Sequence, residues 1–237
     1  MLKLGKKYDV EYQYKRAIQC LEQTFPSTLR NWDIRGKAAG TLGATIKPYA
    51  GILFDIIKLA LETNTLSILP AVYLFLLSRH STVSSSSSPK GHASFFCPKR
   101  EILNGYEVTD ESNKTNSIKT TIPLDLALTC NMSRDEILEE ARKHTFSWLV
   151  HDNRPAGALC TTPASCSNSC NRIIGCLWTR PLTPVLCFYE FEHFGTINRL
   201  CAECNRCAQR IHNIGRQQLW LRLPKYFGLP GWNELLQ

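Results

Sequence analysis

Apolar residues recur at helical spacing near the start of the chain. Within residues 2–24 they fall at steps of two to four, with Lys and Glu between them, which predicts one helix. Pro26 ends that helix because proline disfavours helical geometry in the residue before it. A second, short helix carrying Trp32 follows, with Ser27 or Thr28 as its capping residue.

The next apolar stretch predicts a pair of helices. Three glycines between residues 36 and 47 indicate a loop, after which Pro48 opens a helix at a position where its missing N–H costs little. Asn64 is the expected end of this helix. A second apolar helix, 67–77, follows after a very short connection, so we expect the two to pack antiparallel.

Composition then changes abruptly. Residues 80–100 contain a serine run and few core-forming residues, and the polar stretch 110–121 is similar. A short apolar island lies between them, at Ile102, Leu103 and Val108. Such sequence buries too little surface to offset its ordering entropy, so we predict disorder in 80–100.

Helical signals return after Pro123. Residues 124–128 are expected to form a short buried segment. Ser133 and Glu136 have the spacing of a capping box, which predicts a helix from Ser133 to about Val150. Residues 160–207 are expected to be loop-like apart from the apolar patch 185–194.

A final helix is predicted from Asn198 or Ala202 to Arg222, followed by an irregular tail. We expect four large aromatic residues to be packing residues and not a ligand cage: Trp148, Trp220, Phe227 and Trp232. The fold class predicted is all-α, an irregular helical domain with a cysteine-rich, loop-rich segment and a final helix. Its expected divisions are 1–26, 27–79, 80–121 and 122–237.

Composition narrows the class of protein. An apolar fraction of 43% and a charged fraction of 20% are typical of a globular protein. The formal net charge is +8, but the basic residues are scattered, which favours a solvated surface over a nucleic-acid interface. The start has no apolar signal region, and the longest apolar run, 66–77, is well short of the ~20 residues that span a bilayer. We therefore expect a cytoplasmic or nuclear protein with no membrane partner, in which cysteines stay reduced or bind metal.

Several segments resemble a known family. The opening LKLGKKYDVEYQYKRAIQCLEQTFP is similar to the last helical stretch of a BTB/POZ domain. The segments LETNTLSILPAVYL, LEEARKHTFSWL, Cys201-x-x-Cys204 and GRQQLWLRLPKYFGLPGWNELL resemble the downstream helical region of BTB proteins from mushroom-forming fungi. The resemblance covers most of the chain except the serine-rich insert and residues 173–185.

The resemblance implies a non-enzymatic module that binds other proteins. A BTB domain needs roughly a hundred residues ahead of the KYDV segment, within the usual size of a domain. Met1 lies almost on that segment, so we expect a fragment or a relic of such a protein. The BTB dimer region would then be missing, and neither BTB-type dimerisation nor a cullin-adaptor role is expected.

The cysteines form the one site-like constellation. Eleven are present, and Cys201 and Cys204 make a C-x-x-C pair that supplies two thiolates on one turn. With Cys160 and Cys166 they would complete a four-thiolate structural zinc site that ties residues 155–170 to the final helix. Cys160 and Cys166 are preferred to Cys170 because their spacing resembles the looser cysteine pair of the family. The alternative is that these cysteines are reduced thiols in a small core.

Other residues near this constellation are not expected to bind the metal. These are Cys170, Cys207 and His212, the last predicted to be a surface or hydrogen-bonded histidine. The spacing of Glu190, Glu192 and His193 names no third catalytic partner, and no nucleotide, metalloprotease or nucleophile-elbow motif is present. A protein-interaction module is the favoured function. Two alternatives remain: a zinc-stabilised nucleic-acid-binding or transcription-associated protein, and a thiol redox enzyme.

Overall fold

The structure is a computed structural model that describes residues 11–37, 46, 52–77, 124–150, 155–179, 183–194 and 199–237. Of these residues 80% are helical and none lies in a strand, which confirms the all-α prediction. The predictions for residues 80–121 and for the start of the helix at Pro48 lie outside the described residues. No described helix is long and apolar enough to cross a membrane.

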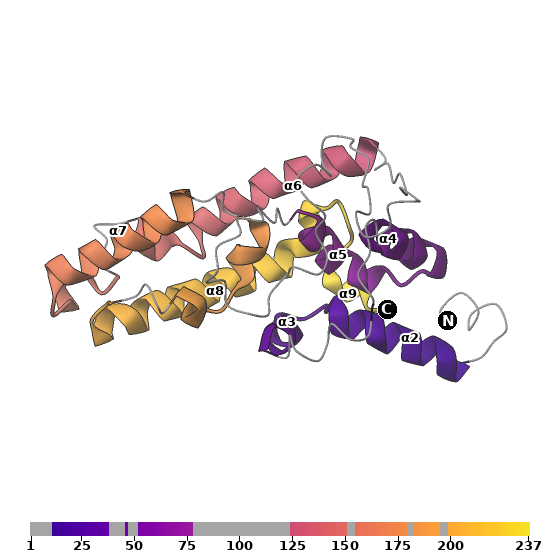
Figure 1. Ribbon diagram of the computed structural model, residues 1–237, viewed down its shortest axis with the longest axis horizontal. Helices are drawn as coiled ribbons and strands as arrows, with labels where there is room; N and C mark the ends of the chain where they lie inside the picture. Colours follow the sequence, from indigo (N-terminus) through magenta and orange to yellow (C-terminus); the bar gives the residue numbers. More distant parts are fainter. Residues whose placement is uncertain are drawn as a thin grey trace, which may run out of the picture. The chain divides into compact units, whose positions relative to one another are not determined.

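The helices follow one another along the chain as Figure 1 shows. The α-helices are α2 (Glu11–Thr24), α3 (Leu29–Lys37), α4 (Ile52–Thr63), α5 (Leu69–Leu76), α6 (Leu124–Lys143), α7 (Pro163–Thr179), α8 (Ala202–Tyr226) and α9 (Trp232–Leu235). Short 3-10 helices lie between them: η2 (Leu66–Ile68), η4 (Ser147–Leu149), η5 (Gly157–Leu159), η6 (Pro184–Phe188) and η7 (Phe191–Phe194).

The chain divides into two compact units. Unit 1 comprises residues 1–133 and 224–237, and unit 2 comprises residues 134–223. The four segments predicted from the sequence are a different division, and they stay predictions.

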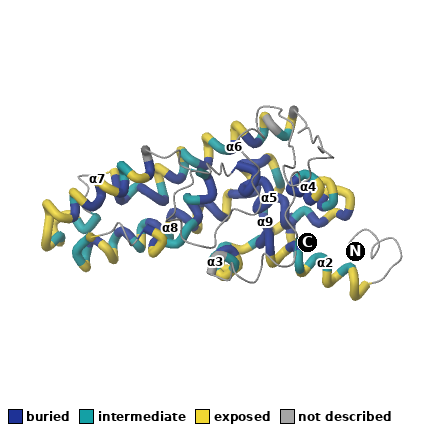
Figure 2. The backbone as a smooth tube through the Cα atoms, viewed as in Figure 1, coloured by how far each residue is buried: buried dark blue, intermediate teal, exposed yellow. Residues whose placement is uncertain are grey.

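The core of unit 1 is built on α5, which is buried along its whole length (Figure 2). The ring of Phe75 meets Phe25 edge-on at 5.8 Å and Trp32 at 5.4 Å. On the same helix, the ring of Tyr73 lies 5.2 Å from that of Phe227. Aromatic pairs at these separations add to the stability that their buried area already gives.

Two helix ends in unit 1 confirm the sequence predictions. The side-chain oxygen of Thr28 accepts a hydrogen bond from the backbone N–H of Asn31 at 3.2 Å, so Thr28 caps α3. The helix α4 stops at Thr63, and Asn64 follows with φ of 59°. Asparagine tolerates this left-handed conformation better than most residues, which explains why the helix ends there.

The predicted capping box at Ser133 is wrong. The helix α6 begins at Leu124, so Ser133 lies inside it and not at its start. Its buried hydroxyl lies 2.6 Å from the carbonyl oxygen of Thr129 and 2.5 Å from that of Tyr226. A serine that bonds to the carbonyl four residues back is compatible with a helix interior. Leu128, which we expected to be buried, is 55% exposed on the same helix.

The loop predicted for residues 160–207 is also wrong over much of its length. Residues 163–179 form α7, with Pro163 in its first turn, a position where proline is favoured. Four buried side chains line one face of this helix: Cys166, Cys170, Ile173 and Leu177. Their spacing of four, three and four is helical, with two cysteines standing where larger apolar residues are more usual.

The final helix starts as predicted but extends further. It runs from Ala202 to Tyr226 and contains Pro224 in its last turn. Gly228, at φ of 67°, then turns the chain, and the backbone N–H of Leu229 donates to the carbonyl oxygen of Pro224 at 3.0 Å. Glycine accepts this conformation without strain, which makes it a common helix terminator. The predicted irregular tail also contains the short helix α9.

The core of unit 2 surrounds His212, which is fully buried on α8. Its imidazole ring lies between 5.5 and 5.7 Å from the rings of Phe146, Phe191 and Phe194. Since a carbonyl oxygen can only accept, Nε2 of His212 carries the proton that it donates to Tyr189 at 3.0 Å. The prediction of a hydrogen-bonded histidine is confirmed, and the prediction of a surface position is wrong.

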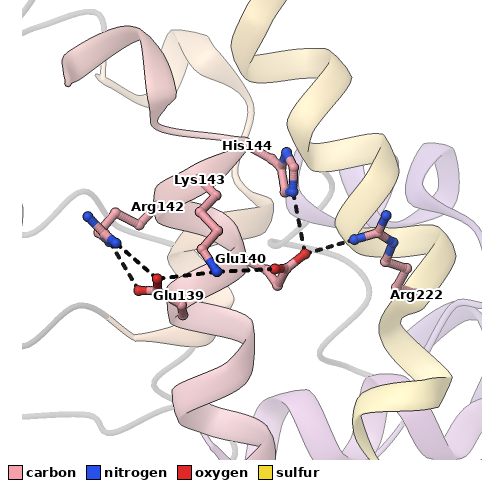
Figure 3. A network of polar contacts seen from close by, with 6 residues as sticks. All are labelled: Glu139, Glu140, Arg142, Lys143, His144 and Arg222. Carbon is pink, nitrogen blue, oxygen red and sulfur yellow. Dashed lines mark hydrogen bonds and ion pairs between the residues drawn. The ribbon is translucent and has the colours of Figure 1, made fainter. Parts of the chain in front are cut away.

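A close approach brings α8 against the end of α6 within unit 2. A Cβ atom on Gly215 would lie 2.4 Å from the backbone Cα and N of Thr145 and 2.5 Å from the backbone carbon of His144. Only glycine fits at that distance. A little further along the helix, Arg222 donates a hydrogen bond to the carboxylate of Glu140 at 2.7 Å. Figure 3 shows that the same carboxylate also pairs with Lys143 on α6 and with His144 in the turn after it.

Candidate metal centre

Four cysteines from two separate segments of unit 2 meet at one point. Cys160 follows the 3-10 helix η5, and Cys166 lies in the first turn of α7. Cys201 immediately precedes α8, and Cys204 lies in its first turn. Figure 1 shows α7 and α8 beginning at the same end of this unit, which is where the four side chains converge.

The four sulfur atoms lie within 4.8 Å of one another. The Sγ atoms of Cys160 and Cys201 are 3.9 Å apart, and all described cysteines are free thiols. In a tetrahedral site with metal–sulfur bonds of about 2.3 Å, neighbouring sulfurs are separated by about 3.8 Å. The cluster therefore has the ligand number and the dimensions of a four-thiolate metal site. It consists of the four cysteines expected from the sequence.

Backbone N–H groups point at these sulfurs from several directions. The N–H of Cys201 donates to Sγ of Cys166 at 3.2 Å. Backbone hydrogen bonds also reach Cys160 from Thr162 and Cys204 from Ala156. Donors aimed at sulfur favour thiolates over neutral thiols, because they stabilise the negative charge. A metal centre needs thiolates, so these donors support a metal site over a cluster of inert buried thiols.

The pKa values of the cluster's thiols diverge. Hydrogen bonds from the backbone of Cys204 and from the backbone and side chain of Thr161 lower the pKa of Cys201 to about 5. Burial raises the pKa of Cys204 and of Cys160 above the usual thiol range. Without metal, Cys201 is therefore a thiolate at neutral pH. Metal binding at the site has to displace protons from its more buried thiols.

The segment that carries Cys160 has little core of its own. From Pro155 to Ser165 no side chain is buried, and Gly157, Ala158 and Leu159 are exposed. The first buried side chain of this stretch is that of Cys166 itself. Hydrophobic packing does not hold these residues in place, whereas a metal bound to Cys160 would.

Within the part of the chain that the structure describes, three neighbouring residues, Cys170, Cys207 and His212, lie outside the close group of sulfurs. Cys170 is buried on the next turn of α7, and burial raises its pKa to about 11, so it remains a neutral thiol. His212 lies among aromatic rings and is engaged by the Tyr189 backbone.

The side chains of Glu192 and His193 contact different neighbours. Glu192 accepts a hydrogen bond from the side-chain amide of Gln209 at 2.6 Å. The ring of His193 stacks edge-on against Tyr189 at 4.5 Å.

Sequence reasoning missed two features around the four cysteines: the helix that carries Cys166, and the Ala156, Thr161 and Thr162 groups that donate hydrogen bonds to the sulfurs. The helix α7 could have been predicted from Pro163 in its first turn and from the helical spacing of Cys166, Cys170 and Ile173.

No protein-family model matches this chain, and neither the curated proteins nor the solved structures contain a match.

Proposed function

We propose that unit 2 binds one zinc ion through Cys160, Cys166, Cys201 and Cys204, and that the ion has a structural role. The observation that carries this proposal is the convergence of four sulfurs within 4.8 Å from two segments of the chain. Four thiolates with no fifth ligand typify closed, structural zinc sites, whereas catalytic zinc keeps a position open for water. The ion joins residues 155–165, which lack a core, to the start of α8.

On this basis the chain functions as a zinc-stabilised, non-catalytic module that binds other proteins. The interaction role is supported by the resemblance of its helical segments to the downstream region of BTB proteins. The zinc ion supports it indirectly, because a rigid metal-held loop presents a fixed surface to a partner.

Metal analysis tests the zinc site directly. Protein produced with zinc in the medium and purified without chelator should contain about one zinc per chain. Cys166→Ser and Cys204→Ser should abolish it, since each removes one of four ligands. Cys176→Ser is the matched control, because this cysteine is exposed on α7 and lies outside the cluster. A full zinc content in Cys204→Ser would refute the site.

A second measurement avoids dependence on the folding of variants. Replacing zinc by cobalt(II) in the wild-type protein should produce the intense sulfur-to-cobalt charge-transfer and visible bands of a tetrahedral thiolate site. Weak bands typical of octahedral cobalt would contradict four-sulfur coordination.

The interaction role is tested against the nucleic-acid alternative. A protein that binds mainly phosphates loses affinity by orders of magnitude between low and moderate salt. We expect no binding to duplex or single-stranded oligonucleotides in fluorescence anisotropy at physiological salt. We also expect a defined protein partner in chemical crosslinking that resists nuclease treatment. Tight, steeply salt-dependent oligonucleotide binding would favour the nucleic-acid function instead.

A further inference from the structure

The four cysteines of the metal site differ in their access to solvent. Cys166 and Cys204 are fully buried, with no exposed surface. Cys160 and Cys201 are partly exposed. Their two sulfurs are also close neighbours, 3.9 Å apart, although they come from positions 41 residues apart in the sequence. A small oxidant dissolved in water therefore has better access to Cys160 and Cys201 than to the two buried cysteines, and each of the two segments that the site joins carries one of the pair.

We propose that Cys160 and Cys201 are the redox-active pair of the site, and that a hydroperoxide joins them in a disulfide and expels the metal. The choice of the pair rests on the exposure of these two cysteines, and the 3.9 Å between their sulfurs allows the bond to form. The expulsion of metal rests on the zinc site proposed above.

With hydrogen peroxide the reaction has two steps. One sulfur of the pair attacks a peroxide oxygen as a thiolate, so that an S–O bond forms, the O–O bond breaks and hydroxide leaves. The other sulfur then attacks this sulfenic sulfur as a thiolate, so that the S–S bond forms, the S–O bond breaks and a second hydroxide leaves. Two electrons pass from the sulfurs to the peroxide, and the two hydroxides take up protons to become water.

The geometry favours this pair over its rivals. A disulfide requires an S–S distance of about 2.05 Å, so the two sulfurs need to approach by a little under 2 Å. The segment 157–165 on the Cys160 side has no buried side chain to resist that movement. The competing pairs Cys201–Cys204 and Cys160–Cys166 each include a cysteine that has no contact with solvent.

The product keeps the connection that the metal made. Of the four ligands only Cys166 and Cys204 remain as thiols, which is too few to hold zinc in a closed site. The new covalent bond nevertheless still ties residues 155–165 to the start of α8. Oxidation therefore exchanges one link between these segments for another, and a disulfide closing a loop of this length constrains the unfolded chain substantially.

Disulfide mapping on the whole chain tests the pair. Zinc-loaded protein is treated with a few equivalents of hydrogen peroxide while a chromophoric chelator reports released zinc. Remaining thiols are alkylated with one reagent, disulfides are reduced, and the released thiols are alkylated with a second, heavier reagent. Fragment mass spectra then locate the second label at single cysteines, which matters because Cys201 and Cys204 share one tryptic peptide.

We expect about one zinc released per chain and the second label on Cys160 and Cys201, with the first label on Cys166 and Cys204. Cys176→Ser should give the same map, because that cysteine is outside the cluster. The second label on Cys204 or Cys166, or no second label in protein whose zinc has been lost, would overturn the proposed pair. An untreated protein without zinc would contradict the proposed function and the expulsion of metal, while the positions of the second label would still decide the pair.

Thermal stability gives an independent reading. After zinc removal, the oxidised protein should melt roughly 5 to 15 °C above the reduced, metal-free protein, because the disulfide restrains the same segment. Equal melting temperatures for the two metal-free forms would contradict the retained connection.

Discussion

His212 is a histidine held in its neutral form by its surroundings. It is fully buried among three phenylalanine rings, and burial lowers its pKa to about 4. Hydrogen bonding to the backbone of Tyr189 opposes this shift, and the nearby charge of Arg216 adds to it. In the unfolded chain the same side chain should titrate near the ordinary value of about 6.5.

This difference in pKa predicts a loss of stability in mild acid. Between pH 6.5 and 4 the unfolded state binds a proton that the folded state does not, so stability falls as the pH falls through this window. Above pH 6.5 the contribution is constant. A shift of this size corresponds to about 3 kcal/mol in the free energy of unfolding. Urea titrations between pH 4 and 8 measure it.

A comparison of two variants isolates the contribution of His212. His212→Gln keeps an N–H donor for the Tyr189 carbonyl but does not titrate, so its stability should depend less on pH in this window. Ser165→Ala, which changes an exposed side chain that does not titrate, should keep the wild-type dependence. The same slope in all three proteins would show that His212 is not the responsible group.

Ser133 makes a second residue-scale prediction. Its hydroxyl is 1% exposed and lies against two carbonyl oxygens of unit 1, those of Thr129 and Tyr226. The single hydroxyl proton can serve one of them at a time. Ser133→Ala should lower the free energy of unfolding by about 1–2 kcal/mol, since it removes a buried donor. Chemical denaturation measures the loss, and Ser165→Ala, at an exposed position on α7, should cost nothing.

Single residues also show what sequence reasoning could reach. Cys201 and Cys204 were predictable because a C-x-x-C pair supplies two ligands whatever fold surrounds it. Cys160 and Cys166 were preferred to Cys170 on the resemblance, because their own spacing is wider than that of a usual zinc-binding pair. The burial of Trp148 and Trp220 was predictable from their size alone. The prediction for Ser133 was wrong although its spacing to Glu136 satisfies the capping-box pattern. That pattern takes no account of the Tyr226 carbonyl oxygen, which accepts a hydrogen bond from the same hydroxyl.

At the scale of elements, the close contact between α8 and the turn after α6 requires that residue 215 has no side chain, which glycine provides. Gly215→Ala would place a methyl group 2.4 Å from the backbone of Thr145, so the two segments have to separate. The helix gains about 1 kcal/mol in propensity from alanine, but overpacking against backbone costs about 1–3 kcal/mol or more. We expect a net loss of stability, measured as a lower melting temperature.

Gly175 provides the matched control for this substitution. It also lies within a helix, α7, but a Cβ atom there would meet nothing within 4 Å. Gly175→Ala should therefore leave the melting temperature unchanged or raise it by a few degrees. If both variants behaved alike, the close approach at Gly215 would not be a determinant of stability.

Helix existence was easier to predict than helix extent. Apolar periodicity identified α4 and α5 because their buried residues are large. The helix α7 escaped detection because Ser, Asn, Cys and Gly fill most of it, residues that are more often found in turns and loops. Its buried stripe relies on small cysteine side chains, which count as apolar only once their burial is known.

At the scale of the whole molecule, the proposed metal belongs to one unit only. All four cysteines lie within residues 134–223. Unit 1 has an apolar core of its own around α5, with Phe75 packed on Phe25 and Trp32. Unit 2 also has buried aromatic and aliphatic side chains, and the proposed metal would add a link between two of its segments that unit 1 does not share.

This difference predicts a local response to metal removal. Local opening is governed by the interactions that hold a segment, and residues 155–165 have no buried side chain to hold them. A strong zinc chelator under reducing conditions should therefore raise amide hydrogen exchange at least tenfold in residues 155–170 and 199–206, measured by mass spectrometry, because the metal's contribution to folding is lost there. The amides of α5 should keep their protection. Added zinc should restore slow exchange in the first two segments, while an equal rise across α5 would show that unit 1 depends on the metal as well.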